Sequence, residues 1–184
     1  MNLPERGLSQ VRIGVAIAVP EPFGSRLQDA RARLGDPLAQ AIPPHITVIG
    51  PTVVDVSVLE AVSEHLEKVA AETPPFRVHL RGAGTFRPVS PVVFVSLAEG
   101  IAECEQLETA ARSGVLAQDL RFNYHPHVTV AHQVADAFLD RAFVEMADFD
   151  GVFEVDRLWQ YEHGDDGVWR PHRSFRLAGA PPAS

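Results

Sequence analysis

Two short stretches of the sequence place a histidine and a threonine two residues apart. The first has the letters PHITV and spans residues 44–48, and the second has the letters PHVTV and spans residues 126–130. β-Branched residues favour strands, and side chains alternate between the two faces of a strand, so each His shares a face with its Thr. The two side chains start about 6.6 Å apart on that face. Each stretch therefore presents an imidazole and a hydroxyl group together.

Two imidazoles that face one reacting centre can divide the proton transfers of a phosphodiester cleavage. Their ordinary pKa of about 6.5 allows one ring to be neutral and the other protonated near neutral pH. The neutral ring takes a proton from the attacking water or hydroxyl and the protonated ring gives one to the leaving oxygen, each contributing roughly 10²- to 10⁴-fold. The hydroxyls of Thr47 and Thr129 would donate hydrogen bonds to phosphate oxygens. We therefore predict that His45 and His127 form an acid–base pair that needs no metal, cofactor or nucleophilic Ser or Cys.

The elements that must position these residues occur twice in the same order. In the first half, the pattern predicts a strand at 11–19, a helix at 25–34, the first motif strand ending at Gly50-Pro51, a helix with Asp55 as its N-cap and a strand at 76–81. In the second half, it predicts a strand at 92–97, a helix at 101–116, the second motif strand, a helix at 136–146, and a hairpin of strands 153–161 and 168–177.

This order predicts a single bilobal domain, residues 1–184. Two pseudo-symmetric βαβαβ lobes would span about 10–85 and about 90–178, followed by a flexible tail at 179–184. An approximate two-fold axis would bring the two motif strands together across a central cleft. The first strand alternates apolar residues with Arg12, Gly14, Ala16 and Ala18, so its second face is small enough to lie under another part of the chain.

Composition narrows the class of protein. The chain has 184 residues, of which 46% are hydrophobic, and a net charge of −8. It is long enough for a sizeable core, and its charge argues against an extended grip on duplex DNA, which needs a basic surface. No signal peptide or membrane-spanning run is expected, so we predict a cytoplasmic protein that does not bind membranes. We also predict a monomer. The single cysteine, Cys104, lies among acidic neighbours in a helix and is interpreted as an ordinary helix residue.

With these motifs, the chain resembles the 2H phosphoesterase superfamily, in its branch of 2'-5' RNA ligase-like and LigT-like proteins. That family is defined by two His-x-Thr-x motifs about eighty residues apart. The resemblance extends from Val11 to the terminal hairpin with Trp159, Trp169 and Phe175. It implies a bilobal α+β fold with antiparallel sheets, and hydrolysis of 2',3'-cyclic, 2'-5' or related nucleotide or RNA-end phosphodiesters. Carried over to this chain, it implies His45 as proton donor, His127 as proton acceptor, and Thr47 and Thr129 as phosphate ligands.

One position departs from the family pattern. LigT-like members commonly carry Arg five positions after the second motif's His, where this chain has His132. The permanent charge becomes a titratable one, and in a straight strand His132 would face away from His127.

Several readings of other residues stay open. Tyr124 and Phe86 would either stack on a base or pack in the core. A metal site of His125, His127 and His132 is disfavoured, because no acidic residue falls between them and the first motif would be unexplained. Four other histidines are interpreted as ordinary hydrogen-bonded residues, namely His65, His79, His163 and His172. Arg170, Arg173 and Arg176 form a solvated strand face or contact a phosphate. The alternative to catalysis is a module that only binds a nucleotide or phosphorylated ligand in the same cleft.

Overall fold

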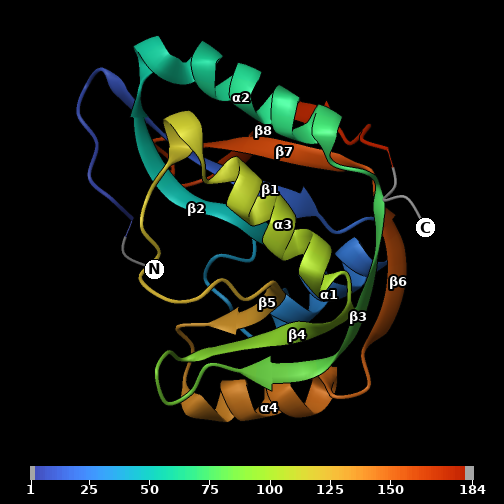
Figure 1. Ribbon diagram of the computed structural model, residues 1–184. Helices are drawn as coiled ribbons and strands as arrows, with labels where there is room; N and C mark the ends of the chain where they lie inside the picture. Colours follow the sequence, from blue (N-terminus) through green and yellow to red (C-terminus); the bar gives the residue numbers. More distant parts are fainter. Residues whose placement is uncertain (1–2, 181–184) are drawn as a thin grey trace.

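One curled antiparallel sheet with four helices makes up the structure, a computed structural model that describes residues 3–180. The sheet order is β6-β3-β4-β5-β2-β1-β7-β8 (Figure 1). The strands are β1 (Gln10–Ala18), β2 (His45–Asp55), β3 (Phe76–Thr85), β4 (Val92–Glu99), β5 (His127–His132), β6 (Asp150–Val155), β7 (Arg157–His163) and β8 (Trp169–Arg176). The helices are α1 (Phe23–Arg33), α2 (Leu59–Glu72), α3 (Ile101–Ala111) and α4 (Asp136–Met146), with 3-10 turns η1 (Val56–Val58) and η2 (Gly114–Leu116). The predicted α+β class is confirmed.

The motif strands β2 and β5 lie side by side at the centre of the sheet. The sheet continues outward from β2 through β1, β7 and β8, and outward from β5 through β4, β3 and β6. Three strands therefore lie on each side of the central pair. Helix α1 contacts β5, and helix α3 contacts β2, so each helix crosses to the motif strand of the other half. In Figure 1, α2 lies above β7 and β8, and α4 lies below β3 and β4.

The two halves of the sheet exchange strands relative to the two halves of the sequence. Strand β3 pairs with β4 and β6, and β7 pairs with β1. The hairpin of β7 and β8 therefore completes the half that holds β1 and β2. The two lobes do not meet as separate sheets, because β2 pairs directly with β5.

A single apolar core supports the motif strands from the side opposite the His and Thr residues. Ile46 and Val128 are fully buried, and helices α1, α2 and α3 contribute buried leucines, among them Leu27, Leu66 and Leu107. Burying each such side chain stabilises the fold by about 1.5–3 kcal/mol. The alternation that buries the β-branched residues is what turns the His and Thr side chains to the other face.

Each motif strand contains a β-bulge at the same place. The pairing with β1 moves from Thr47 to Ile49, and the pairing with β4 moves from Thr129 to Ala131, so one extra residue sits three positions after each His. Two consecutive residues then face the core in each strand, Val48 with Ile49 and Val130 with Ala131. Matching bulges are a structural sign of duplication.

The bulge in β5 also changes the direction of His132. After the extra residue, His132 pairs with Val92, which shares a face with Phe94 and therefore with Thr129. The straight-strand expectation that His132 faces away from the motif is thus wrong, because the bulge resets the alternation.

Several element boundaries differ from the predictions, among them that of the helix expected after Asp55, which begins at Leu59. Strand β2 continues past Gly50-Pro51 to Asp55, the helix predicted at 101–116 ends at Ala111, and the strand predicted at 153–161 is interrupted at Asp156. In the predicted tail, the amide of Gly179 donates to the Thr73 carbonyl at 3.0 Å. Residues 181–184 of that tail lie outside the described residues.

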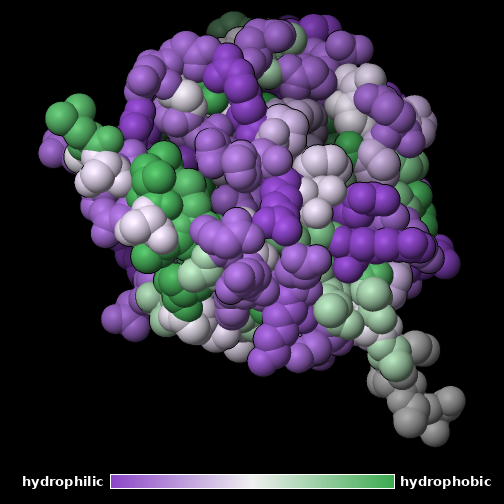
Figure 2. Space-filling model, turned by 90° about the horizontal axis from the view of Figure 1, so that it is seen from above, coloured by the Kyte–Doolittle hydropathy of each residue, from purple (hydrophilic) through white to green (hydrophobic). Residues whose placement is uncertain are grey.

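The surface above α2 is largely hydrophilic, with hydrophobic side chains gathered toward one side (Figure 2). Val56 in η1 and Val115 in η2 are exposed, and both turns contact α2. Among residues 3–180, none of the helices is long and apolar enough to cross a membrane.

Candidate active site

The two motif strands pair through their central residues, Ile46 and Val128. In an antiparallel pair the flanking positions then match, so the His of each motif lies opposite the Thr of the other. Cα atoms of directly opposite residues are about 4.5–5.5 Å apart, closer than the His and Thr within one motif. All four side chains are half-buried on the face away from the core. The structure therefore brings together the four residues predicted for catalysis and phosphate binding, in a two-by-two patch.

Both imidazoles are oriented by the same hydrogen bond. His45 Nδ1 donates to the Pro43 carbonyl at 2.8 Å, and His127 Nδ1 donates to the His125 carbonyl at 2.7 Å. A carbonyl only accepts, so Nδ1 carries the proton and Nε2 is left to exchange protons with a ligand. The proline before each His keeps the preceding residue extended, which presents that residue's carbonyl to the ring. This gives a physical reason for the proline in both motifs.

Burial holds both imidazoles in the neutral form in the free protein. It lowers the pKa of His45 to about 4, against a smaller opposing effect of the Pro43 hydrogen bond, while the positive charge of Arg31 lowers it further. Burial also lowers the pKa of His127, with the His125 hydrogen bond opposing. Each ring is therefore ready to accept a proton at neutral pH, and a proton donor arises only when a nearby negative charge raises one pKa.

The lowered pKa of His45 predicts that acid destabilises the folded protein. The unfolded chain binds this proton near pH 6.5 and the folded protein only near pH 4, so stability is present above pH 6.5 and falls as pH drops through that window. Between neutral pH and about pH 4, the protonation of His45 should lower the free energy of unfolding by about 1–3 kcal/mol. Urea denaturation at neutral and acid pH should show a weaker pH dependence in His45→Gln than in wild type or in the exposed variant His172→Gln. Equal dependence in all three would contradict this cause.

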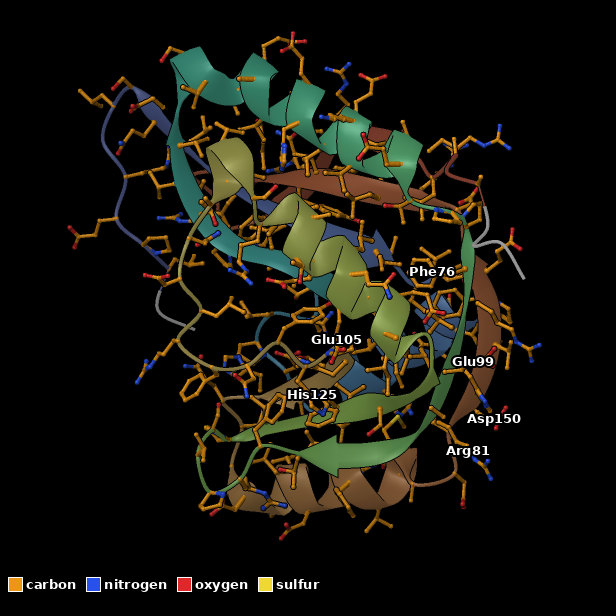
Figure 3. All side chains as sticks on the ribbon, viewed as in Figure 1. Phe76, Arg81, Glu99, Glu105, His125 and Asp150 are labelled. Carbon is orange, nitrogen blue, oxygen red and sulfur yellow. The ribbon has the colours of Figure 1, made fainter. Side chains whose placement is uncertain are left out.

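An aromatic group lies beside His127. Phe86 packs on Phe94 with ring centroids 4.4 Å apart, and its ring lies 5.0 Å from that of His127 and 5.5 Å from that of His125. His125 is labelled in Figure 3, above β4 and beside the start of β5. A Cβ atom at Gly84 would collide with the Phe94 ring, so glycine is required there. Phe86 is half-buried next to the patch of His and Thr side chains.

Tyr124 braces the two motif strands. Its hydroxyl donates to the Thr47 carbonyl at 2.9 Å, and its ring packs against the core. Burial raises the pKa of this hydroxyl well above its usual range. The structure thus brings Tyr124 to the site, but its hydroxyl is hydrogen-bonded to the backbone and its ring packs against the core.

The remaining histidines and Cys104 lie in ordinary surroundings. Their side-chain partners are Ala111 carbonyl for His65, Asp150 for His79, Arg12 for His163 and Glu162 for His172. Cys104 is fully buried, and burial together with Glu103 and Glu105 raises its pKa to about 12. Arg170 pairs with Asp166, and Arg173 with Glu60 and Glu67. Within residues 3–180, no cluster of three or more His, Cys, Asp or Glu is arranged to hold a metal ion.

Sequence reasoning missed residues that the sheet places next to the motifs. Ala16 pairs with Thr47 on one side and with Trp159 on the other, so Trp159 lies on the same face as the motif His and Thr residues, two strands away from β2. The ring of Trp169 lies over Gly14, which explains the small second face of β1. Arg31, in the helix predicted at 25–34, is a buried charge that affects His45. The signal for Arg31 was present, because a charged residue interrupts a row of buried positions.

The arrangement of the fold is shared with known structures. Crystal structures of E. coli LigT match this chain at TM-scores of 0.69 for the complex with 3'-AMP and 0.64 for the complex with phosphate. Both are 21% identical to this chain, and they cover 91% and 92% of it and 98% of LigT. The protein is therefore of the LigT-like fold class.

The sequence comparison identifies the family. A family model described as the 2'-5' RNA ligase superfamily matches residues 19–167, which include both motifs. A curated relative from Bacillus thuringiensis (strain Al Hakam), named "Putative phosphoesterase", is 29% identical over 171 residues, covering 91% of this chain and 97% of the relative. The chain belongs to the 2'-5' RNA ligase superfamily, and the resemblance seen in its motifs is confirmed.

Proposed function

We propose that this protein is a metal-independent phosphoesterase that hydrolyses 2',3'-cyclic or related nucleotide or RNA-end phosphodiesters, with His45 and His127 as its acid–base pair. The observation that carries the proposal is the matched orientation of the two imidazoles. Each donates its Nδ1 proton to a backbone carbonyl, which leaves Nε2 as the nitrogen that can exchange a proton, on one face with two threonine hydroxyls. Two rings prepared in the same way beside one phosphate-sized patch suit a reaction with two proton transfers.

The chemistry follows from this geometry. One neutral Nε2 takes a proton from water as the water oxygen bonds to phosphorus, and the other, protonated, gives its proton to the leaving ribose oxygen as the bond from phosphorus breaks. The free site lacks a proton donor, because both imidazoles are neutral there. The negative charge of the bound phosphate raises the pKa of the nearby imidazoles, so that one of them can be protonated. The hydroxyls of Thr47 and Thr129 donate to the non-bridging oxygens. The positive charge of Arg31 favours the neutral form of His45 in the free protein, so His45 takes up the proton that it would donate only when the phosphate is bound.

The surroundings support a nucleotide as the group attached to that phosphate. The half-buried Phe86 lies next to His127, where its aromatic ring is placed to stack on a base. A net charge of −8 suits a short substrate better than a long duplex. The LigT structures bound to 3'-AMP and to phosphate agree with this class of ligand.

The direct test is a substrate panel in excess chelator. Purified protein is incubated with 2',3'-cyclic nucleotides and with short 2'-5'-linked and cyclic-phosphate-ended oligonucleotides, while chromatography measures the products and calorimetry measures binding. We expect turnover that is unchanged by chelator. Binding without any product would instead indicate a non-catalytic binding module. Activity that is lost with chelator and restored by zinc would overturn the proposal in favour of a metal-dependent hydrolase.

A further inference from the structure

Helix α1 carries a buried ion pair close to the first motif. Arg31 is 3% exposed and Asp36 is 5% exposed, and Arg31 Nε donates to Asp36 Oδ2 at 2.9 Å. The neighbouring buried positions on α1 are apolar, Leu27 and Ala30. Buried charges are costly unless their hydrogen bonds are satisfied, so such a pair is weak evidence for stability alone. Its contacts show what else it does.

The guanidinium of Arg31 organises the segment that leads to His45. Its Nη1 donates to the Ile42 carbonyl at 2.6 Å and its Nη2 donates to the Leu38 carbonyl at 3.0 Å. Asp36 Oδ1 accepts the Leu38 amide at 3.0 Å. The planar fork of Arg therefore holds three acceptors at fixed angles, which a single ammonium group does not reproduce.

That segment ends on the carbonyl that orients the catalytic ring. Ile42 is bonded to Pro43, whose carbonyl accepts the His45 Nδ1 proton. We propose that Arg31 is a positioning residue for His45, because it fixes Ile42 and through it the carbonyl that sets the direction of the imidazole. The catalytic meaning of this inference rests on the proposed phosphodiesterase function, whereas the orientation of the ring does not.

The equivalent helix of the other half carries the opposite charge. The buried positions of α1 and α3 correspond, with 27, 30, 31 and 34 matching 104, 107, 108 and 111. Arg31 thus corresponds to Glu108, which is 2% exposed and pairs with Arg112. The acting charges at His45 are Arg31 from α1, paired with Asp36, and His127 from β5 when protonated. The two histidines have the same orientation, but the matching buried position of the equivalent helix is a positive Arg31 in one half and a negative Glu108 in the other.

Two substitutions of Arg31 separate the effect of its hydrogen bonds from the effect of its charge. Arg31→Lys keeps the positive charge and loses donors to Ile42 and Leu38, whereas Arg31→Met loses both. We expect kcat to fall roughly 10- to 100-fold in both variants, with KM changing less, because the ring is misplaced. Only Arg31→Met should raise the pKa of His45, since only it removes the nearby positive charge. The limb of the pH profile that reports the pKa of His45 should therefore move to higher pH in Arg31→Met and stay in place in Arg31→Lys.

The control and the deciding readout are independent of turnover. Glu108→Gln breaks a buried pair at the matching position of α3 and should leave the tautomer and pKa of His45 unchanged. NMR of the ring nitrogens in the ligand-free protein reports both quantities, so it gives an answer even if every phosphodiester proves not to be a substrate. We expect the Nδ1–H tautomer of His45 to lose population in both Arg31 variants. A wild-type tautomer in a folded Arg31→Met or Arg31→Lys protein would overturn the inference, and Arg31→Lys alone decides it if Arg31→Met does not fold.

Discussion

Replacing His45 or His127 with alanine should lower kcat toward cyclic phosphodiesters by roughly 10²- to 10⁴-fold. Each variant removes one of the two free Nε2 atoms and therefore one of the two proton transfers. The double variant should lose little more than either single one, because residues that act as a unit are strongly non-additive. The measurement is kcat and KM for wild type, both single variants and the double variant on one substrate.

A matched control separates this loss from general damage. His172→Ala removes an exposed histidine that pairs with Glu162, far along the sheet on β8, and should retain wild-type activity. Circular dichroism should show each active-site variant to be folded, because both rings are only half-buried and lie outside the core. A His45→Ala or His127→Ala protein with wild-type kcat would sink the acid–base pair.

The faces of the motif strands could be predicted because they depend on local alternation. His, Thr and the β-branched residues between them take opposite sides of any strand, whatever its partners. The bulges could not be read with the same ease. They show only as two consecutive apolar residues, Val48-Ile49 and Val130-Ala131, which break the alternation after each Thr. That break is the sequence signal from which the position of His132 on the same face as Thr129 could have been predicted.

The strand exchange lies beyond local patterns. The apolar alternation of β3 is satisfied equally well by any partner with a matching face, and its actual partners, β4 and β6, are chosen by the packing of the whole sheet. The same holds for β7, which pairs with β1 across most of the chain length. Trp159 entered the catalytic face only through this pairing. Residues that depend on remote partners are therefore the part of the site that sequence reasoning misses.

Replacing Thr47 or Thr129 with valine should lower kcat/KM by roughly 10²- to 10³-fold, the range for loss of one preorganised donor to a charged oxygen. Valine keeps the shape of threonine and removes its hydroxyl. Both threonines are half-buried on the catalytic face, and each lies across from the other motif's histidine. Binding of inorganic phosphate, followed by calorimetry, should weaken in the same variants because the lost donors bind the ground state too.

The serine variants make this prediction specific to the hydroxyl. Thr47→Ser and Thr129→Ser keep the donor and lose a methyl group, so they should stay within a few-fold of wild type, whereas the valine variants should not. Because the two motifs share strand pairing, bulge and imidazole orientation, the two threonines should also give losses of similar size. A valine variant as active as its serine counterpart would show that the hydroxyl does not contact the phosphate. A large loss at one threonine alone would show that the substrate sits in one half of the pseudo-symmetric patch.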